Sequence, residues 1–185
     1  DPQLRARLTP DYEIGCKRLL ISNDYFPAFA RETVRLEPSA LDRLEGSTAV
    51  SAAGERYELD VLVMATGFEA TRPPFAKHIY GRAGTSLDAQ WNLGMQAFRS
   101  TTVHGFPNLF MINGPNTGLG HNSIVYIIEA QVDYILGALD YAERNGVGVL
   151  EPTPAAEQHY MDDLHDRSQG TVWLNGGCKS WYVDP

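Results

Sequence analysis

The sequence predicts an α/β fold, and two observations support that prediction. Residues 61–64 form an unbroken apolar run, as expected for a central parallel strand that is covered on both faces. Farther along, the expected strand NLFMI (108–112), the glycine-rich loop 113–123 and a segment with helical periodicity follow one another. The order strand, glycine-rich turn, helix is typical of nucleotide-binding sites in α/β proteins. We therefore expect strands and helices arranged around such a loop.

The first expected strands lie in the N-terminal third of the chain. LLIS (19–22) is a short apolar run that predicts a buried strand, and TVRLEP (33–38) alternates like a half-buried strand. Residues 47–60 have the pattern of a hairpin, with Ala53 and Gly54 at the turn between two short strands.

The strongest strand signal is DVLVMATGF (60–68), which continues directly from the hairpin. Residues 69–107 contain Pro73-Pro74, several glycines and no sustained period, so we expect a long irregular connection. NLFMI (108–112) is expected to form another buried strand ahead of the glycine-rich loop.

Two helices are expected after the loop. Asn122 or Ser123 can cap the first helix, and Gly146 can supply the left-handed residue at its end. A second helix is expected from Thr153-Pro154 to about Ser168. The apolar residues that recur at helical spacing in the first helix are Ile124, Ile127, Ile128, Val132, Ile135, Leu136 and Leu139.

The composition narrows the possible function. The 185 residues are 43% hydrophobic and 21% charged, which favours a packed core over disorder. The net charge of −8 argues against binding to nucleic acid or to an anionic membrane. No run of about 18 apolar residues occurs, so no transmembrane helix is expected. Cys16 and Cys178 are far apart without ligand-like spacing, and we expect two reduced thiols in a cytoplasmic protein.

The ends of the chain suggest part of a longer polypeptide. DPQLRARLTPDYEIG begins without an initiator methionine, and KSWYVDP stops without a cap or a polar tail. We therefore expect a fragment.

The loop NGPNTGLGHNS (113–123) is the leading candidate site. It resembles a dinucleotide fingerprint, but the third glycine is missing and the loop is too long. Three interpretations remain open. The loop binds a pyrophosphate, it aims the positive end of a helix at another electron-rich group, or it is a structural turn.

Two further motifs are candidates. In GCKR (15–18), Lys17 offers a point charge for a phosphate and Arg18 a planar fork for an anion, although such pairs are most often solvated surface. In ATGF (65–68), Thr66 and Gly67 form a tight turn that allows a ligand or a second domain to come close. The histidine spacing predicts no metal site, and no Gly-x-Ser-x-Gly elbow suggests a hydrolase.

Four stretches taken together resemble the flavin-dependent Baeyer–Villiger monooxygenases, relatives of the flavin-containing monooxygenases. The stretches are GCKRLLISNDYFPAF, YELDVLVMATGF, GFPNLFMINGPNTGLGHNSIVYIIEAQVDYI and GCKSWYVDP, in that order. The resemblance spans nearly the whole chain. ATGF is shared with many flavoproteins, whereas CKR and SWY in the same chain point more narrowly to the Baeyer–Villiger group.

The resemblance implies an enzyme that uses FAD and NADPH to insert one oxygen atom from O₂ beside the carbonyl of a small ketone. It implies that Arg18 is catalytic and stabilises negative charge on the oxygenated flavin. Lys17 would meet the 2′-phosphate of NADPH, and Trp181 would lie near the nicotinamide cofactor. Without the resemblance, Trp181 would be taken as an ordinary core or surface aromatic residue.

The resemblance also assigns the remaining site residues. Thr66 and Gly67 would lie at the crossover between the two cofactor domains. The amide near Ile124, with Asn122 and Ser123 beside it, would face the pyrimidine edge of the flavin, where the helix dipole stabilises the anion formed on reduction.

The implied architecture is part of a flavoprotein with two dinucleotide-binding domains. Residues 1–14 would be the tail of a helical insertion, 15–67 the C-terminal half of the NADPH domain, and 68–185 the C-terminal part of the FAD domain. Neither Gly-x-Gly-x-x-Gly fingerprint is present, nor is the family's Phe-x-Gly-x-x-x-His signature. The missing N-terminal half of the same enzyme is thus an expected partner, and the fragment is expected to be inactive alone.

Two alternatives remain. The parent could be an N- or S-oxygenating flavin monooxygenase, or the chain could be a non-catalytic interaction module derived from such an enzyme.

Overall fold

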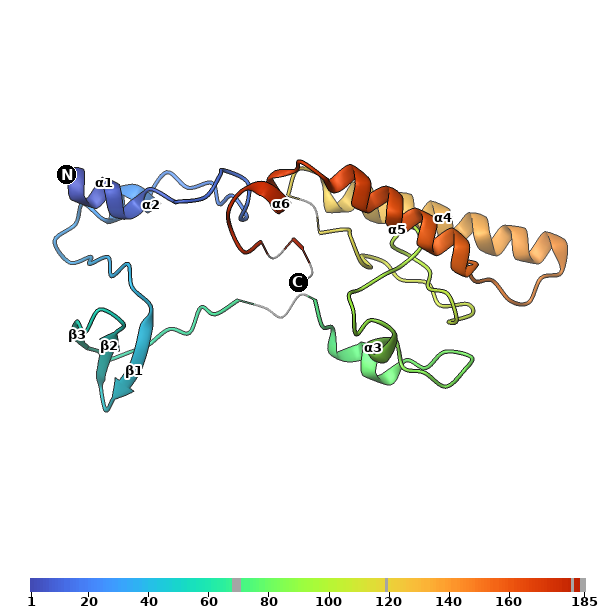
Figure 1. Ribbon diagram of the computed structural model, residues 1–185, viewed down its shortest axis with the longest axis horizontal. Coiled ribbons are helices and arrows are strands. Elements are labelled where there is room, and N and C mark those ends of the chain that lie inside the picture. Colours follow the sequence, from blue (N-terminus) through green and yellow to red (C-terminus); the bar gives the residue numbers. More distant parts are fainter. Residues whose placement is uncertain (68–70, 119, 181, 184–185) are drawn as a thin grey trace. The chain divides into compact units, whose positions relative to one another are not determined.

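The computed structural model describes residues 1–67, 71–118, 120–180 and 182–183 (Figure 1). Two compact units divide the chain. The first unit contains residues 1–10 and the described residues from 20 to 67. The second contains residues 11–19 and the described residues from 71 onward. Each unit has its own helices, and the three strands all lie in the first.

The first unit begins with helix α1 (Pro2–Leu8). Asp1 caps this helix because its carboxylate accepts a hydrogen bond from the amide of Gln3 at 2.8 Å, and Pro2 has the fixed φ that suits a first helical position. A second short helix, α2 (Tyr25–Ala28), follows where the Ser22 hydroxyl accepts from the amides of Asp24 and Tyr25.

The first unit also contains an antiparallel sheet with the order β1-β2-β3. Its strands are β1 (Leu41–Glu45), β2 (Thr48–Ser51) and β3 (Arg56–Glu58). The central strand β2 is buried throughout. The predicted hairpin over 47–60 is confirmed, with Gly54 at φ 87° in the turn. The sequence did not predict β1, whose alternating charges hide its pairing with β2.

Three of the other predicted strands are wrong within the described residues: 19–22, 33–38 and 60–67 contain no strand. Ile21 is fully exposed and Val63 is 80% exposed. The apolar runs correctly mark segments suited to burial, but a strand also needs a neighbour to accept its backbone hydrogen bonds. No described strand pairs with these runs.

The hydrophobic core of the second unit lies in a stretch that looks irregular in the sequence. It is built around 3₁₀ helix η1 (Pro74–His78), helix α3 (Leu87–Gln90) and the loops that follow. The buried residues of this core are Ala76, Leu87, Trp91, Ala97, Val103, Phe106 and Met111. The predicted irregular connection over 69–107 is thus correct in backbone type, but it supplies most of this core.

The predicted strand over 108–112 is also wrong. Met111 is buried and Leu109 packs against the core, yet the segment contains no strand and is irregular. Asn108 instead joins residues 148–150: its amide donates to the Leu150 carbonyl, and its side-chain oxygen accepts from the Leu150 amide, each at 2.9 Å. Asn108 has a left-handed backbone conformation, at φ 60°, and its hydrogen bonds to Leu150 take the place of strand pairing at this position.

Both predicted helices after the loop are confirmed. Helix α4 (Ile124–Asn145) ends at Gly146, which has φ 63° and ψ 30°. Helix α5 (Pro154–Ser168) begins after Thr153, whose hydroxyl accepts from the Ala156 amide at 3.2 Å. A four-residue helix, α6 (Val172–Asn175), follows. The apolar face of α4 is only partly covered, since Leu136 and Leu139 are exposed.

No helix in the part of the chain that the structure describes is both long and apolar enough to cross a membrane.

Candidate functional site

A hydrogen bond to Gln131, a buried residue of α4, holds the glycine-rich loop in place. Its side-chain oxygen accepts a hydrogen bond from the Asn113 amide at 2.9 Å. Its side-chain nitrogen donates to the Ser100 carbonyl at 2.9 Å and to the Thr101 hydroxyl at 3.0 Å. The loop backbone lies so close to residue 100 that a β-carbon on Gly114 would come within 2.3 Å of the Ser100 oxygen. Hydrogen bonding and close packing therefore fix the position of the first part of the loop.

The second part of the loop leads into the N-terminus of α4, where three predicted site residues lie in succession. Ser123 occupies the cap position, but its hydroxyl makes no capping bond. Instead, the side-chain oxygen of Asn122 accepts from the Ser123 amide at 2.8 Å. Ile124 begins the helix and is half exposed. The first amides of a helix lack partners within it, so this end can donate to a ligand carbonyl.

An aromatic stack joins this loop to the C-terminal segment. The His121 ring stacks on Trp173 of α6 with centroids 5.4 Å apart, and Trp173 meets Tyr182 at 5.7 Å. A β-carbon on Gly120 would lie 2.7 Å from the Tyr182 hydroxyl. No sequence motif marks this stack, because its members are 52 and nine residues apart and rings that stack need no common motif.

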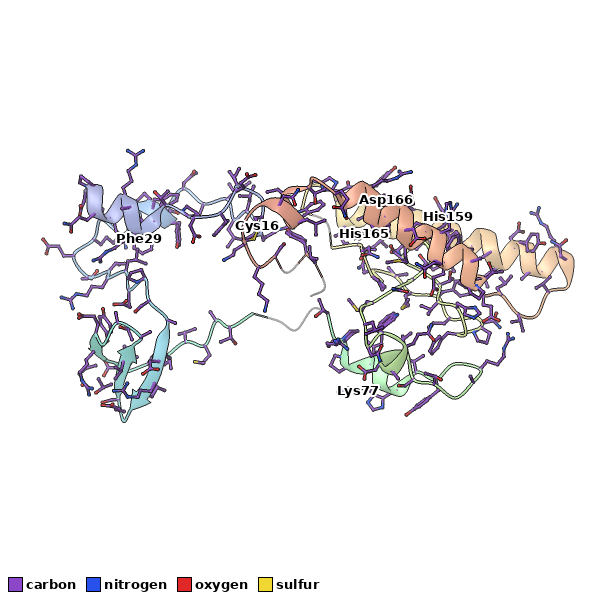
Figure 2. The ribbon with its side chains drawn as sticks, in the orientation of Figure 1. Cys16, Phe29, Lys77, His159, His165 and Asp166 are labelled. Carbon is purple, nitrogen blue, oxygen red and sulfur yellow. A yellow bond between two sulfur atoms is a disulfide. The ribbon has the colours of Figure 1, made fainter. Side chains whose placement is uncertain are left out.

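The GCKR segment is fastened to the same region by a disulfide between Cys16 and Cys178, whose Cα atoms are 6.1 Å apart. The prediction of two reduced thiols is therefore wrong for this structure. The sequence could not reveal the pairing, since 162 residues separate the two cysteines and only the fold brings them together. Figure 2 shows Cys16 beside α6.

Lys17 and Arg18 project from this fastened segment. The Lys17 ammonium lies 4.6 Å from the centre of the Tyr12 ring, within the range of a cation–π interaction. Arg18 is exposed and makes no hydrogen bond or ion pair with any described residue. Its guanidinium group is thus available to an anionic ligand.

The remaining predicted site residues are not brought to this cluster by any described contact. Thr66 and Gly67 belong to the first unit, where Gly67 has φ 83°, as a tight turn requires. Trp181 lies outside the described residues.

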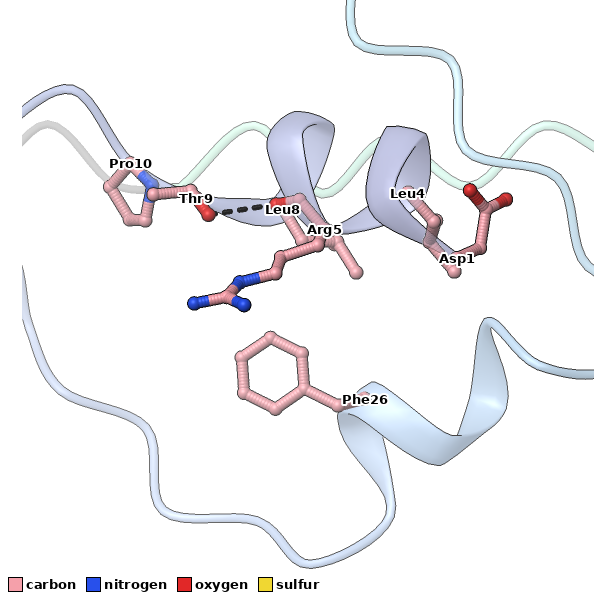
Figure 3. A pocket seen from close by; sticks show the side chains of 7 residues that line it. All are labelled: Asp1, Leu4, Arg5, Leu8, Thr9, Pro10 and Phe26. Atoms are coloured by element: carbon pink, nitrogen blue, oxygen red, sulfur yellow. Dashed lines mark hydrogen bonds between the residues drawn. The ribbon is translucent and has the colours of Figure 1, made fainter.

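Two shallow pockets lie away from these motifs. The first, in the first unit, is formed between α1 and α2, where Phe26 points toward α1 (Figure 3). The second lies between residues 98–99 and α5, and Figure 2 labels its His159. The first is lined by Asp1, Leu4, Arg5, Leu8, Thr9, Pro10 and Phe26, and the second by Phe98, Arg99, Ala156, His159, Tyr160, Asp163 and Arg167. None of the predicted site residues that the structure describes lines either pocket.

Titratable groups with shifted pKa values lie in the first unit. Hydrogen bonds from the Thr48 and Ser47 hydroxyls lower the pKa of Glu58. Hydrogen bonds from the Ser39 side chain and backbone, together with one from the Tyr57 hydroxyl, lower the pKa of Glu37. These carboxylates stabilise the sheet and its flanking loop and lie in neither pocket.

Two similar sequences carry the same name. The chain is 44% identical over 188 residues to a Baeyer–Villiger monooxygenase of Streptomyces coelicolor and 42% identical over 185 residues to one of Pseudomonas aeruginosa. Both alignments cover the whole of this chain but only 36% and 35% of the relative. The chain therefore spans about a third of the length of these curated relatives. No protein-family model matches it.

Solved structures give the same result. Cyclohexanone monooxygenase from Rhodococcus sp. Phi1 bound to NADP⁺ matches 97% of the chain at 31% identity, with a TM-score of 0.82. A steroid monooxygenase bound to NADP matches 99% at 28% identity, with a TM-score of 0.84. The chain covers 34% and 35% of those proteins. It is therefore related, over its whole length, to one part of the flavin-dependent Baeyer–Villiger monooxygenases.

Proposed function

We propose that this chain is part of an FAD- and NADPH-dependent monooxygenase that inserts one oxygen atom from O₂ beside a ketone carbonyl. The observation that carries this proposal is sequence identity of 44% along the whole chain to a Baeyer–Villiger monooxygenase. The exposed guanidinium of Arg18, beside a segment cross-linked to the C-terminal motif, supports it.

The residues at the N-terminus of α4 fit the flavin that this function requires. The exposed end of a 22-residue helix presents free amides and a positive dipole, which suit the pyrimidine edge of a flavin. In this proposal the Ile124 amide meets that edge, and Asn122 and Ser123 shape the turn before it. The hydrogen bond to Gln131 and the close packing at Gly114 hold the start of the loop in place.

The two cations of GCKR have separate roles in this proposal. Lys17 binds the 2′-phosphate of NADPH as a point charge, and Arg18 stabilises negative charge beside the reacting ketone. Bound FAD and NADPH supply the electrons and the activation of O₂. Thr66 and Gly67 serve as a crossover between domains, and Trp181 lies near the nicotinamide.

The architecture proposed is the C-terminal portions of an NADPH domain (15–67) and an FAD domain (68–185), preceded by the tail of a helical insertion (1–14). The exposed apolar runs at 19–22 and 61–64 support this architecture, because they suit strands of a sheet completed by another part of the enzyme. Pyrophosphate binding would belong to that other part, since the sequence contains no Gly-x-Gly-x-x-Gly fingerprint.

Replacement of Arg18 by alanine in the complete monooxygenase tests the catalytic assignment. NADPH oxidation should remain while ketone oxygenation falls about 100-fold or more, because a charge aimed at the reacting centre is lost. Ester or lactone formation and NADPH consumption are measured together, with Arg31→Ala as a control at an exposed arginine of the first unit. Undiminished oxygenation by Arg18→Ala would show that this arginine has another role. Oxidation of amines or sulfides in place of ketones would favour the alternative parent.

Titration of the isolated chain with FAD tests the division of the cofactor site. Because the pyrophosphate cradle is missing, we expect no binding at micromolar FAD and no shift of the flavin spectrum. Micromolar binding with a shifted spectrum would show that this chain holds the flavin by itself.

A further inference from the structure

Cys16 and Cys178 each occupy the centre of a Gly-Cys-Lys tripeptide, at 15–17 and 177–179. The disulfide between them links the segment 11–19, which contains no helix or strand, to the residues that follow α6. No role follows for this bond from the proposed monooxygenase reaction, in which neither sulfur takes part.

The two segments also meet through contacts that do not depend on the disulfide. The Glu13 amide donates to the Gly176 carbonyl at 2.8 Å, and the Ser180 hydroxyl donates to the Cys16 carbonyl at 2.9 Å. A β-carbon on Gly176 would lie 2.9 Å from the Cys16 β-carbon, so the absence of a side chain permits the close approach. These contacts would keep the two sulfur atoms near each other after reduction, which favours reformation of the bond.

Accessibility of the two cysteines is unequal. Cys16 is completely buried, whereas Cys178 is half-buried and therefore reachable by an external thiol. Lys17 and Arg18 directly follow the buried cysteine, and beyond them Leu19 is exposed. The bond thus restrains the chain immediately before the two cations.

We propose that Cys16–Cys178 is a redox modification site that responds to dithiol reductants and controls how firmly the Lys17–Arg18 segment is held. A thiolate of the dithiol attacks the Cys178 sulfur, and the Cys16 sulfur leaves as a thiolate that takes up a proton. The second thiol of the reductant then displaces Cys178, which is also protonated. The protein gains two electrons and two protons, and the dithiol becomes a disulfide.

The consequence of this switch for catalysis rests on the role proposed for Arg18. With the bond intact, a covalent link holds the backbone just before Arg18 to the residues that follow α6. With the bond reduced, the described hydrogen bonds of Glu13 and Ser180 remain to hold it. Productive oxygenation, which needs the charge in one place, should therefore be better coupled to NADPH oxidation in the oxidised form.

Thiol labelling and trypsin digestion of the intact chain test the site independently of activity. Without reductant, alkylation should label neither cysteine, and trypsin should cut slowly after Lys17 and Arg18. After treatment with dithiothreitol, both cysteines should be labelled and cleavage there should be at least about tenfold faster, because the local constraint is gone. Cleavage after Arg31 and Arg35, exposed residues of the first unit, should not change.

The double variant Cys16→Ser/Cys178→Ser provides the matched comparison. It should be cut after Lys17 and Arg18 at the rate of the reduced chain, with or without dithiothreitol. In the unreduced wild-type chain, the fragments produced by this cleavage should stay joined through the disulfide and separate when it is reduced. Two labelled cysteines in unreduced protein, or equal cleavage rates in both redox states, would overturn the proposal.

The coupling of NADPH oxidation to product formation in the complete monooxygenase distinguishes failure of the redox proposal from failure of the proposed function. Product formed per NADPH oxidised should fall at least about twofold on reduction in the wild type and should not respond to reduction in the double serine variant. Wild-type coupling that is unchanged on reduction would overturn the control of Arg18. If Arg18→Ala retained full ketone oxygenation, the function proposed for Arg18 would fail, while the labelling and digestion results would still decide whether the cysteines form a redox site.

Discussion

Gln131 shows how one side chain can hold a functional loop. Most residues of α4 are partly or fully exposed, yet this glutamine is buried and its amide group is hydrogen-bonded through both its oxygen and its nitrogen. It ties the loop at Asn113 to the turn at Ser100 and so connects two segments that no strand joins. Because glutamine is polar, the apolar periodicity of the helix does not mark this position in the sequence.

Replacement of Gln131 by leucine should lower the free energy of unfolding by about 1–3 kcal/mol, because the Asn113 amide and the carbonyl of buried Ser100 lose their hydrogen-bond partner. Chemical denaturation of the isolated chain measures the change. Gln158→Leu is the control, since Gln158 is exposed on α5 and its side chain bonds, among the described residues, only to Asp162, and its effect should stay within about 0.5 kcal/mol. Equal effects of the two changes would contradict the structural role of Gln131.

At the scale of elements, the antiparallel sheet depends on carboxylates that accept hydrogen bonds. Hydrogen bonds from Arg56 and Arg43 lower the pKa of Glu45 on β1, and those from the Thr48 and Ser47 hydroxyls lower that of Glu58 on β3. Each carboxylate is therefore easier to ionise in the folded sheet than in the unfolded chain. The energy involved is small, since these groups are exposed and well screened.

The sheet should consequently lose stability in acid. A lowered pKa stabilises the folded state above the unfolded-state value, about 4.3 for glutamate, and this contribution is lost as the pH falls through the folded value. Amide NMR signals of residues 48–58, followed from pH 7 to pH 3, should report opening that begins below about pH 4.5. Glu58→Gln should be less stable at pH 7 and should show a shallower decline. A decline as steep as that of the wild type would mean that Glu58 does not contribute.

At the scale of the whole molecule, apolar side chains lie on segments without a pairing partner. Residues 20–22 and 61–64 belong to the first unit and Leu19 to the second, and the apolar side chains of both runs are extensively exposed among the described residues. In a protein that spans about a third of its relatives, this exposure supports the proposal that further chain covers them.

Replacement of Ile21 and Val63 by lysine distinguishes folding of the isolated chain from its assembly with the rest of the enzyme. In the isolated chain both substitutions should change the melting temperature little, because the side chains are exposed. In the FAD-dependent monooxygenase proposed above, they should greatly reduce the yield of FAD-loaded protein, because a charge would enter the sheet proposed to be buried there. Leu93→Lys, at a residue that is also exposed but lies outside any apolar run, is the control for both measurements. Normal FAD loading of the double variant would contradict burial of these segments.

Much of the local structure could be predicted because its causes are local. Helices α4 and α5 and the hairpin of β2 and β3 follow from periodicity, caps and a glycine turn within a few residues of each other. The motifs GCKR and GHNS could likewise be recognised as candidates, and comparison with relatives agrees with the family that they indicate. The strands predicted at 19–22, 33–38, 60–68 and 108–112 are wrong within the described residues, because pairing depends on residues distant in sequence.

The sequence by itself determined the helices, the hairpin and the resemblance to Baeyer–Villiger monooxygenases, since these depend on short-range pattern and on residue identity along the chain. Only the tertiary structure decided that an irregular stretch forms the core, that Gln131 seats the loop, and that Cys16 meets Cys178 across 162 residues. The physical reason is that burial, pairing and cross-linking depend on which distant segments become neighbours, and that information is not contained in any local stretch of the sequence.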